Sequence, residues 1–134
     1  MPIKVNKLTN GPIILARHHE PMDWLMEILE MFEQIFTLRD TFQRCPKYYV
    51  IVDVSAVKAS FGKMTLTLSE AMKTSHRHRS DMPVNLSLIG SSQQIVFASR
   101  ALGQQQYREY YMPLYDSVDK ALNSIHADIA LWAE

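Results

Sequence analysis

The stretch YYVIVDVSAVKASFGKM, residues 48–64, decides the fold of this chain. Its first part is an unbroken run of aromatic and β-branched residues, which is typical of a central strand covered on both faces. The run turns polar at Asp53, and residues 61–75 then carry apolar side chains at helical spacing. A buried strand, a short loop and a helix in this order predict an α/β arrangement.

The residues before this stretch predict a hairpin and a long helix. Residues 3–8 alternate apolar and polar, an Asn-Gly pair follows, and residues 13–18 form a second predicted strand. A helix is expected over residues 24–44, with Asp23 as its N-cap and Pro46 ending it. Its expected apolar face holds Trp24, Leu25, Ile28, Leu29, Phe32, Ile35, Phe36 and Phe42, and its polar face holds Glu27, Glu30, Glu33 and Gln34.

The residues after this stretch continue the alternation of strands and helices. A strand is predicted over residues 84–90, a helix over 92–106, and a short strand over 110–115 that Pro113 places at or near a sheet edge. The chain then closes in a helix capped by Asp116 or Ser117, with a buried face of Val118, Ala121, Leu122 and Ile125.

This order of elements, ββαβαβαβα, predicts an α/β fold with a mixed, mostly parallel β-sheet flanked by four helices. The opening hairpin makes the first strand an antiparallel addition to the sheet. A length of 134 residues fits a single domain spanning residues 1–134.

The composition of the chain limits which partners it can attract and which cell compartment is expected. Fourteen basic residues balance fourteen acidic ones, so no net charge attracts the chain to nucleic acid or to an acidic membrane. A single cysteine, Cys45, cannot form an intrachain disulfide and reads as an inert buried thiol. The sequence lacks an apolar run of the ~20 residues that a membrane span needs, and it opens without a signal peptide, so a cytoplasmic protein is expected.

Short motifs in the second half of the chain resemble the STAS domain family, the anti-sigma-factor antagonists and their relatives. Asp53-Val54-Ser55, a short apolar loop and Ser60-Phe61-Gly62 are similar to that family's Asp-Leu-Ser and Asp-Ser-Ser-Gly elements. The segments VNLSLIGSSQQIVFASRALG and YMPLYDSVDKALNSI are similar to its later strand–helix units. The resemblance covers roughly residues 12–126 and implies the SpoIIAA-like (STAS-like) fold. The chain departs from the pattern in its shorter loop, in Ala59 and in Phe61.

The resemblance implies a non-enzymatic protein-interaction module in a bacterial signalling route. Ser60 takes the place of the family's phosphate-accepting serine, with a serine kinase related to anti-sigma factors as the partner; an unmodified Ser60 would instead cap the following helix. The residues expected to contact a partner are Asp53, Ser55, Lys58 and Lys63, together with Val57, Phe61 and Met64 as exposed apolar residues.

Several alternatives stay open at this point. Asp53 can simply accept hydrogen bonds from the amides of Ser55 and Ala56. The apolar helix 24–44 can flank a pocket for a small apolar ligand or lipid, as in the lipid-exchange relatives of this fold, or it can fill the core. Self-association through that helix or the edge strand near Tyr111 would give a homodimer.

The other polar segments favour no chemistry. The run His76-Arg77-His78-Arg79 reads as a solvated positive loop, with a weak anion site as the alternative, because it has no metal-ligand spacing. Tyrosines and Arg108 within residues 103–111 favour a protein contact over nucleic acid. No serine-hydrolase elbow and no phosphate-binding glycine loop occurs, so we expect no enzyme activity, no cofactor and no metal.

Overall fold

The computed structural model describes residues 3–9, 11–20, 24–42, 45, 47–57, 70, 84–90 and 113–132. Along the chain, these residues form β1 (Ile3–Lys7), β2 (Ile13–His19), α1 (Trp24–Arg39), β3 (Tyr48–Ala56), β4 (Val84–Ile89), β5 (Leu114–Tyr115) and α4 (Val118–Trp132). Apart from Glu70, the helices expected over 61–75 and 92–106 lie outside the described residues.

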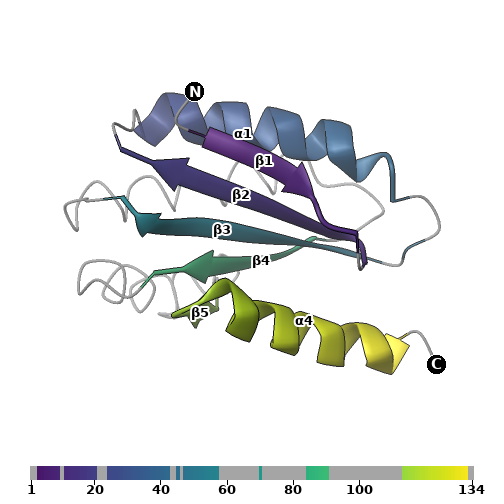
Figure 1. The fold of residues 1–134 in the computed structure, drawn as a ribbon. Coiled ribbons are helices and arrows are strands. Elements are labelled where there is room, and N and C mark those ends of the chain that lie inside the picture. The colour runs from purple at the N-terminus through teal and green to yellow at the C-terminus, as the bar shows by residue number, and fades with distance from the viewer. Residues whose placement is uncertain are drawn as a thin grey trace.

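The five strands form one mixed sheet in the order β1-β2-β3-β4-β5. β1 is antiparallel to β2, and the other neighbouring pairs are parallel. The predicted α/β class, the antiparallel first strand and the edge position of β5 are therefore confirmed. α1 and α4 lie on opposite faces of the sheet (Figure 1).

β3 lies at the centre of the sheet and serves both faces. Tyr48, Val50, Val52 and Val54 pack in the core beneath α1. Tyr49 and Ile51 pack in the second core beneath α4. Because successive strand residues point to opposite faces, the unbroken apolar run is explained by helices on both sides.

The turn between β1 and β2 brings the start of the chain against α4. Gly11 has a φ of +147°, a conformation that residues with a side chain rarely adopt. A Cβ atom on Gly11 would lie 3.2 Å from Cδ1 of Ile129 in α4. The positive φ therefore favours glycine here, and a side chain at this position would also crowd Ile129.

α1 is shorter than the sequence predicts and its buried face is rotated. It ends at Arg39, where the N–H and hydroxyl of Thr41 both donate to the carbonyl of Leu38. Leu29, expected inside, is 47% exposed, whereas Glu27, expected on the polar face, is 5% exposed. Ile28, Phe32, Ile35 and Phe42 are buried as predicted, Phe36 is partly buried, and the side chains of Trp24 and Leu25 lie outside the described residues.

α4 follows the predicted pattern closely. The hydroxyl of Ser117 accepts a hydrogen bond from the backbone N–H of Lys120, which identifies Ser117 as the N-cap. Ala121 and Ile125 are buried, and Val118 and Leu122 are partly buried. None of the helices in the described residues is both long enough and apolar enough to cross a membrane.

Candidate functional site

The carboxyl end of β3 is irregular. Arg17 of β2 pairs with Asp53, but His19, two residues later, pairs with Ala56, so β3 holds one extra residue at this point. Such a bulge bends the strand and re-aims its side chains, and bulges are over-represented next to functional sites. Here it leaves Ser55 and Ala56 exposed between buried neighbours.

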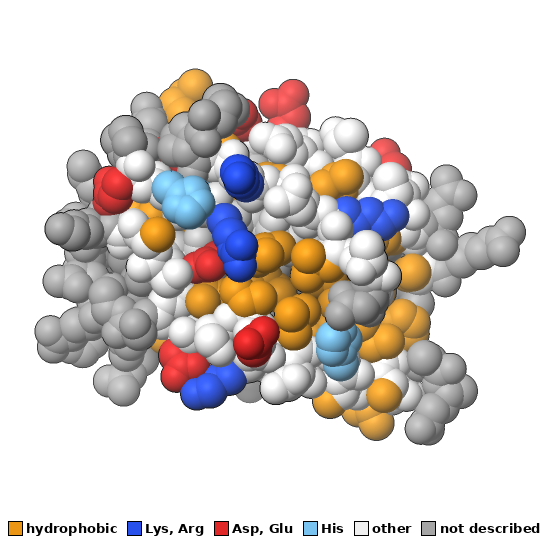
Figure 2. Space-filling view, viewed as in Figure 1, with side chains coloured by type: hydrophobic (Ala, Val, Ile, Leu, Met, Phe, Trp, Pro, Cys, Tyr) orange, Lys and Arg blue, Asp and Glu red, His pale blue; other side chains and the backbone are white. Residues whose placement is uncertain are grey.

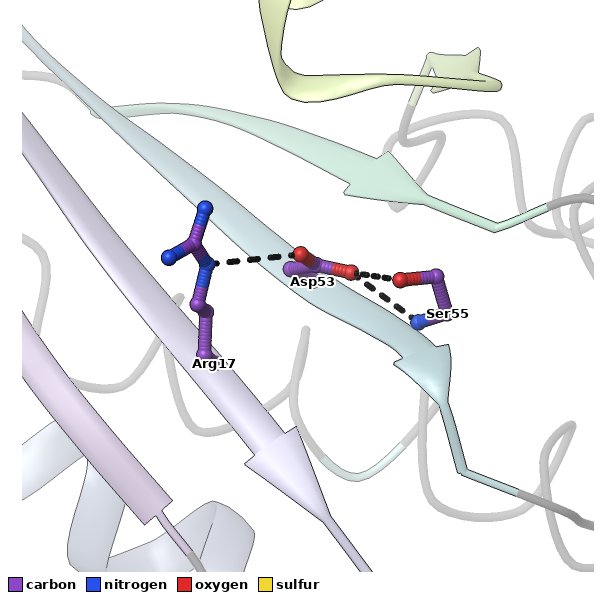
Figure 3. Close-up of polar contacts among 3 residues, drawn as sticks. All are labelled: Arg17, Asp53 and Ser55. Carbon is purple, nitrogen blue, oxygen red and sulfur yellow. Dashed lines mark hydrogen bonds and ion pairs between the residues drawn. The ribbon is translucent and has the colours of Figure 1, made fainter.

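Three side chains, which we call the Asp53 cluster, meet at this bulge: Arg17, Asp53 and Ser55 (Figure 3). One carboxylate oxygen of Asp53 accepts hydrogen bonds from the backbone N–H of Ser55 at 3.0 Å and from its hydroxyl at 2.6 Å. The other oxygen lies 3.6 Å from Nε of Arg17. The Asp53 side chain is 13% exposed and that of Arg17 is 51% exposed. The carboxylate thus holds the bulged end of β3 and forms an ion pair with the arginine beside it.

The structure settles part of the predicted site. The hydrogen bond from the amide of Ser55 to Asp53 is confirmed, while no bond to Asp53 from the amide of Ala56 occurs among the described residues. Val57, expected to be exposed, is only 6% exposed and belongs to the core on the α1 side. Its N–H donates to the carbonyl of Val54, and this turn directs the side chain inward. Lys58, Ser60, Phe61, Lys63 and Met64 lie outside the described residues.

Arg17 was missed in the sequence because its role depends on register. Residues 17 and 53 are far apart in the chain and become neighbours only when β2 pairs in parallel with β3. The available signal was a charged residue late in an otherwise apolar strand.

A second polar cluster lies inside the core, on the α1 side of the sheet. His18 is 1% exposed, and its Nδ1 lies 3.3 Å from Oε1 of Glu27 in α1. Its Nε2 lies 3.3 Å from the sulfur of Met31. Burial lowers the pKa of His18 below its ordinary value, and the nearby carboxylates of Glu27 and Asp53 oppose this shift in part.

A third cluster fastens the last turns of α4 to the beginning of β3. Nζ of Lys47 lies 2.7 Å from a carboxylate oxygen of Asp128, which also accepts a hydrogen bond from the Tyr49 hydroxyl. The indole N–H of Trp132 donates to the same hydroxyl at 3.0 Å. The hydrogen bonds from Lys47 and Tyr49 lower the pKa of Asp128, and burial together with the bond to Asp128 raises the pKa of Tyr49.

The second and third clusters link helices to the sheet, whereas the Asp53 cluster lies at the carboxyl end of parallel strands. In open α/β sheets, ligands bind beyond this end of the strands. Cys45 is partly buried and packs against the α1-side core. The Asp53 cluster is therefore the candidate site.

Comparison with protein-family models and with curated proteins finds no match to the chain. Among solved structures, the chain is similar to one described as the "NMR Structure of the protein TM1081", with a TM-score of 0.49 and 11% sequence identity. The similarity covers 93% of this chain and 87% of that one. Likeness at this level carries no information about function.

Proposed function

We propose that this chain is a non-enzymatic protein-interaction module of the SpoIIAA-like fold, similar to anti-sigma-factor antagonists. Its working surface is the bulged end of β3 and the segment that follows. The four expected helices complete this fold, with those over 61–75 and 92–106 added to α1 and α4.

The observation that carries this proposal is the state of Asp53. Its carboxylate accepts two hydrogen bonds from Ser55 and lies beside Arg17. A general base or a nucleophile needs a carboxylate directed at a substrate, whereas this one is engaged by its own chain. We therefore assign Asp53 a structural role. It shapes the carboxyl end of β3, from which the next segment of the chain begins.

The proposed regulation follows from the family resemblance. The partner is a serine kinase related to anti-sigma factors, and its target is Ser60. Phosphorylation would add about −1.5 to −2 charges near Phe61 and Met64, the apolar residues that are still expected to touch the partner. Desolvating that charge in an apolar interface is unfavourable, so the modified chain releases the partner.

The test is affinity capture of the chain from its own cells with phosphatase inhibitors present, followed by mass spectrometry. We expect two forms of the captured chain: an unmodified form with a bound serine kinase, and a form without the kinase that carries a phosphoryl group on Ser60 but not on Ser55. The Asp53→Ala variant should lose the kinase, because Ser55 and the turn are released. The Asp116→Ala variant, in which an exposed carboxylate paired with Lys120 is removed, should retain it.

Two outcomes contradict the proposal. One is equal capture of the kinase by both variants, which would place the contact elsewhere on the chain. The other is an unmodified chain that carries a lipid or another apolar molecule in place of a protein, which would support the ligand-binding alternative.

A further inference from the structure

Two basic side chains stand directly opposite each other on the hairpin. Lys4 of β1 is the cross-strand partner of Arg17 of β2, and such partners share one face of the sheet. Both are exposed. Like charges in this position repel each other and destabilise the strand pair, so the arrangement has a cost that an anion between them would relieve.

Arg17 is held in a way that leaves its binding groups available. Asp53 contacts Nε, and the two terminal nitrogens of the guanidinium point away from Asp53 (Figure 3). Within the part of the chain that the structure describes, these nitrogens have no other partner, and Lys4 has no acidic partner. Ser55 holds Asp53 through hydrogen bonds, and the ion pair of Asp53 with Nε at 3.6 Å favours this orientation of the arginine before any ligand arrives.

The charge around the pair stays positive. Lys4 and Arg17 contribute two positive charges and Asp53 contributes one negative charge, which leaves one positive charge. Figure 2 shows basic side chains together over β1 and β2, with an acidic side chain next to them and apolar surface towards α4. The terminal nitrogens of an arginine match the paired oxygens of a carboxylate or a phosphate group, and lysine adds a point charge.

We infer that Lys4 and Arg17 form a binding site for an oxyanion, a carboxylate or a phosphate group, on the hairpin face of the sheet. Arg17 donates two hydrogen bonds through its terminal nitrogens, and Lys4 neutralises the bound charge from the opposite strand. Asp53 and Ser55 act as positioning residues. The site shares Asp53 and Ser55 with the surface proposed to bind a protein partner, but its contacts with the anion are made by Lys4 and Arg17 on the hairpin.

The test is a titration of the full chain, labelled with nitrogen-15, followed by NMR at constant ionic strength. Acetate, inorganic phosphate and chloride are the three probes. We expect saturable shifts of the Arg17 Nε–H and of the Lys4 and Arg17 amides with acetate or phosphate, and no saturation with chloride. The tighter of the two saturating probes identifies the ligand class.

Variants separate a built site from general charge attraction. Arg17→Gln should raise the midpoint concentration about tenfold, the loss expected for a charge-assisted hydrogen bond. Lys4→Gln should raise it about threefold, as for an exposed ion pair. Arg17→Lys keeps the charge and loses the paired nitrogens, so it should bind nearly as weakly as Arg17→Gln. Lys7→Gln, on the same strand but the opposite face, should bind as the parent does.

The inference is overturned if chloride saturates like acetate and phosphate, or if Lys7→Gln weakens binding as much as Lys4→Gln. Parent-like binding by Arg17→Lys would reduce the site to a diffuse positive charge and would also refute it. Thermal unfolding of each variant checks that the fold is intact. A negative result here leaves the capture of a kinase at the end of β3 untouched.

Discussion

At the scale of single residues, His18 and Glu27 meet where a helical surface pattern would not place them. The two side chains are buried and share a contact of 3.3 Å. A buried imidazole loses the hydration that stabilises its charged form, which lowers its pKa. The charged groups that oppose this are the carboxylates of Glu27 on α1 and Asp53 on β3, while His19 on β2 adds to it.

This pair predicts a pH-dependent stability. Because the folded pKa of His18 lies below its ordinary value of 6.5, the unfolded chain binds this proton more readily. The contribution of neutral His18 to the free energy of unfolding is fully present above the unfolded pKa. It falls as the pH drops from about 6.5 towards the lower folded pKa. We expect the urea midpoint to be lower at about pH 5.5 than at about pH 7.5, and His18→Gln to reduce that difference.

The control for His18 is its neighbour. His19 is exposed at the end of β2, so His19→Gln should keep the full pH difference. Asp128 does not interfere, because its pKa is lowered from 3.8 and its titration lies at more acidic pH. An unchanged pH difference in His18→Gln would show that another group titrates.

The hydrogen bonds between Asp53 and Ser55 lead to a second prediction for single residues, which concerns stability. Asp53→Ala removes the acceptor of both Ser55 hydrogen bonds and should lower the free energy of unfolding by about 1–2 kcal/mol. Asp53→Asn should cost less, since its amide oxygen can still accept from Ser55 and the 3.6 Å ion pair with the half-exposed Arg17 adds little. Chemical denaturation of both variants measures this. Equal losses of unfolding free energy in the two variants would mean that the negative charge of Asp53 beside Arg17 contributes more to stability than its hydrogen bonds to Ser55.

Only those contacts of the candidate site that join residues close together in the sequence were predictable. The Asp53–Ser55 contact follows from a side chain and an amide two residues apart. Arg17 required the register of β2 on β3, and the inward turn of Val57 required the bulge. Glu27 was assigned to the polar face because charged residues usually are, and its partner His18 becomes visible only in the fold.

At the scale of elements, α4 depends on the cluster at its last turns. Tyr49 of β3 is buried, and its hydroxyl joins Asp128 and Trp132 on the helix. Tyr49→Phe keeps the ring and removes the hydroxyl, which leaves the indole N–H of Trp132 without its acceptor. We expect the free energy of unfolding to fall by about 1–2 kcal/mol, measured by urea denaturation.

Tyr115→Phe is the matched control for this element. The Tyr115 hydroxyl donates to the hydroxyl of Ser124 on the same helix, but at an exposed position. Its removal should cost less than about 0.5 kcal/mol. Losses of the same size in both variants would show that the Tyr49 cluster contributes no more to stability than a surface contact.

The ends of elements were harder to predict than their existence. Pro46 sets the last residue that a helix could reach, but α1 already ends at Arg39, because Thr41 binds the carbonyl of Leu38 with both its N–H and its hydroxyl. The start of α4 was easier, since Ser117 provides a local cap. Local hydrogen bonds of this kind compete within a few residues and leave little trace in the periodicity.

At the scale of the whole molecule, the sequence predicts which strands pair in parallel or antiparallel fashion, but it does not predict the order of the strands in the sheet. The Asn-Gly turn predicts the antiparallel pair β1–β2, and alternation with helices predicts parallel pairing for the others. Periodicity does not state which parallel strands are neighbours. The backbone hydrogen bonds of the sheet define that order, and β3 lies at its centre.

The central position of β3 predicts that the two cores unfold together. Val50 is fully buried on the α1 side, and Ile51 is fully buried on the α4 side. Val50→Ala should lower the free energy of unfolding by about 2 kcal/mol, for the lost methyl groups and the cavity left behind. In a Trp24→Phe background, the fluorescence of Trp132 reports the opposite face. We expect the unfolding midpoint from Trp132 fluorescence and the circular-dichroism midpoint to fall by the same amount, because one strand supplies both cores.

Ile51→Val, on the other face of β3, should likewise shift both midpoints together. A Trp132 midpoint that stays in place while the circular-dichroism midpoint falls would show that the α4 side unfolds on its own.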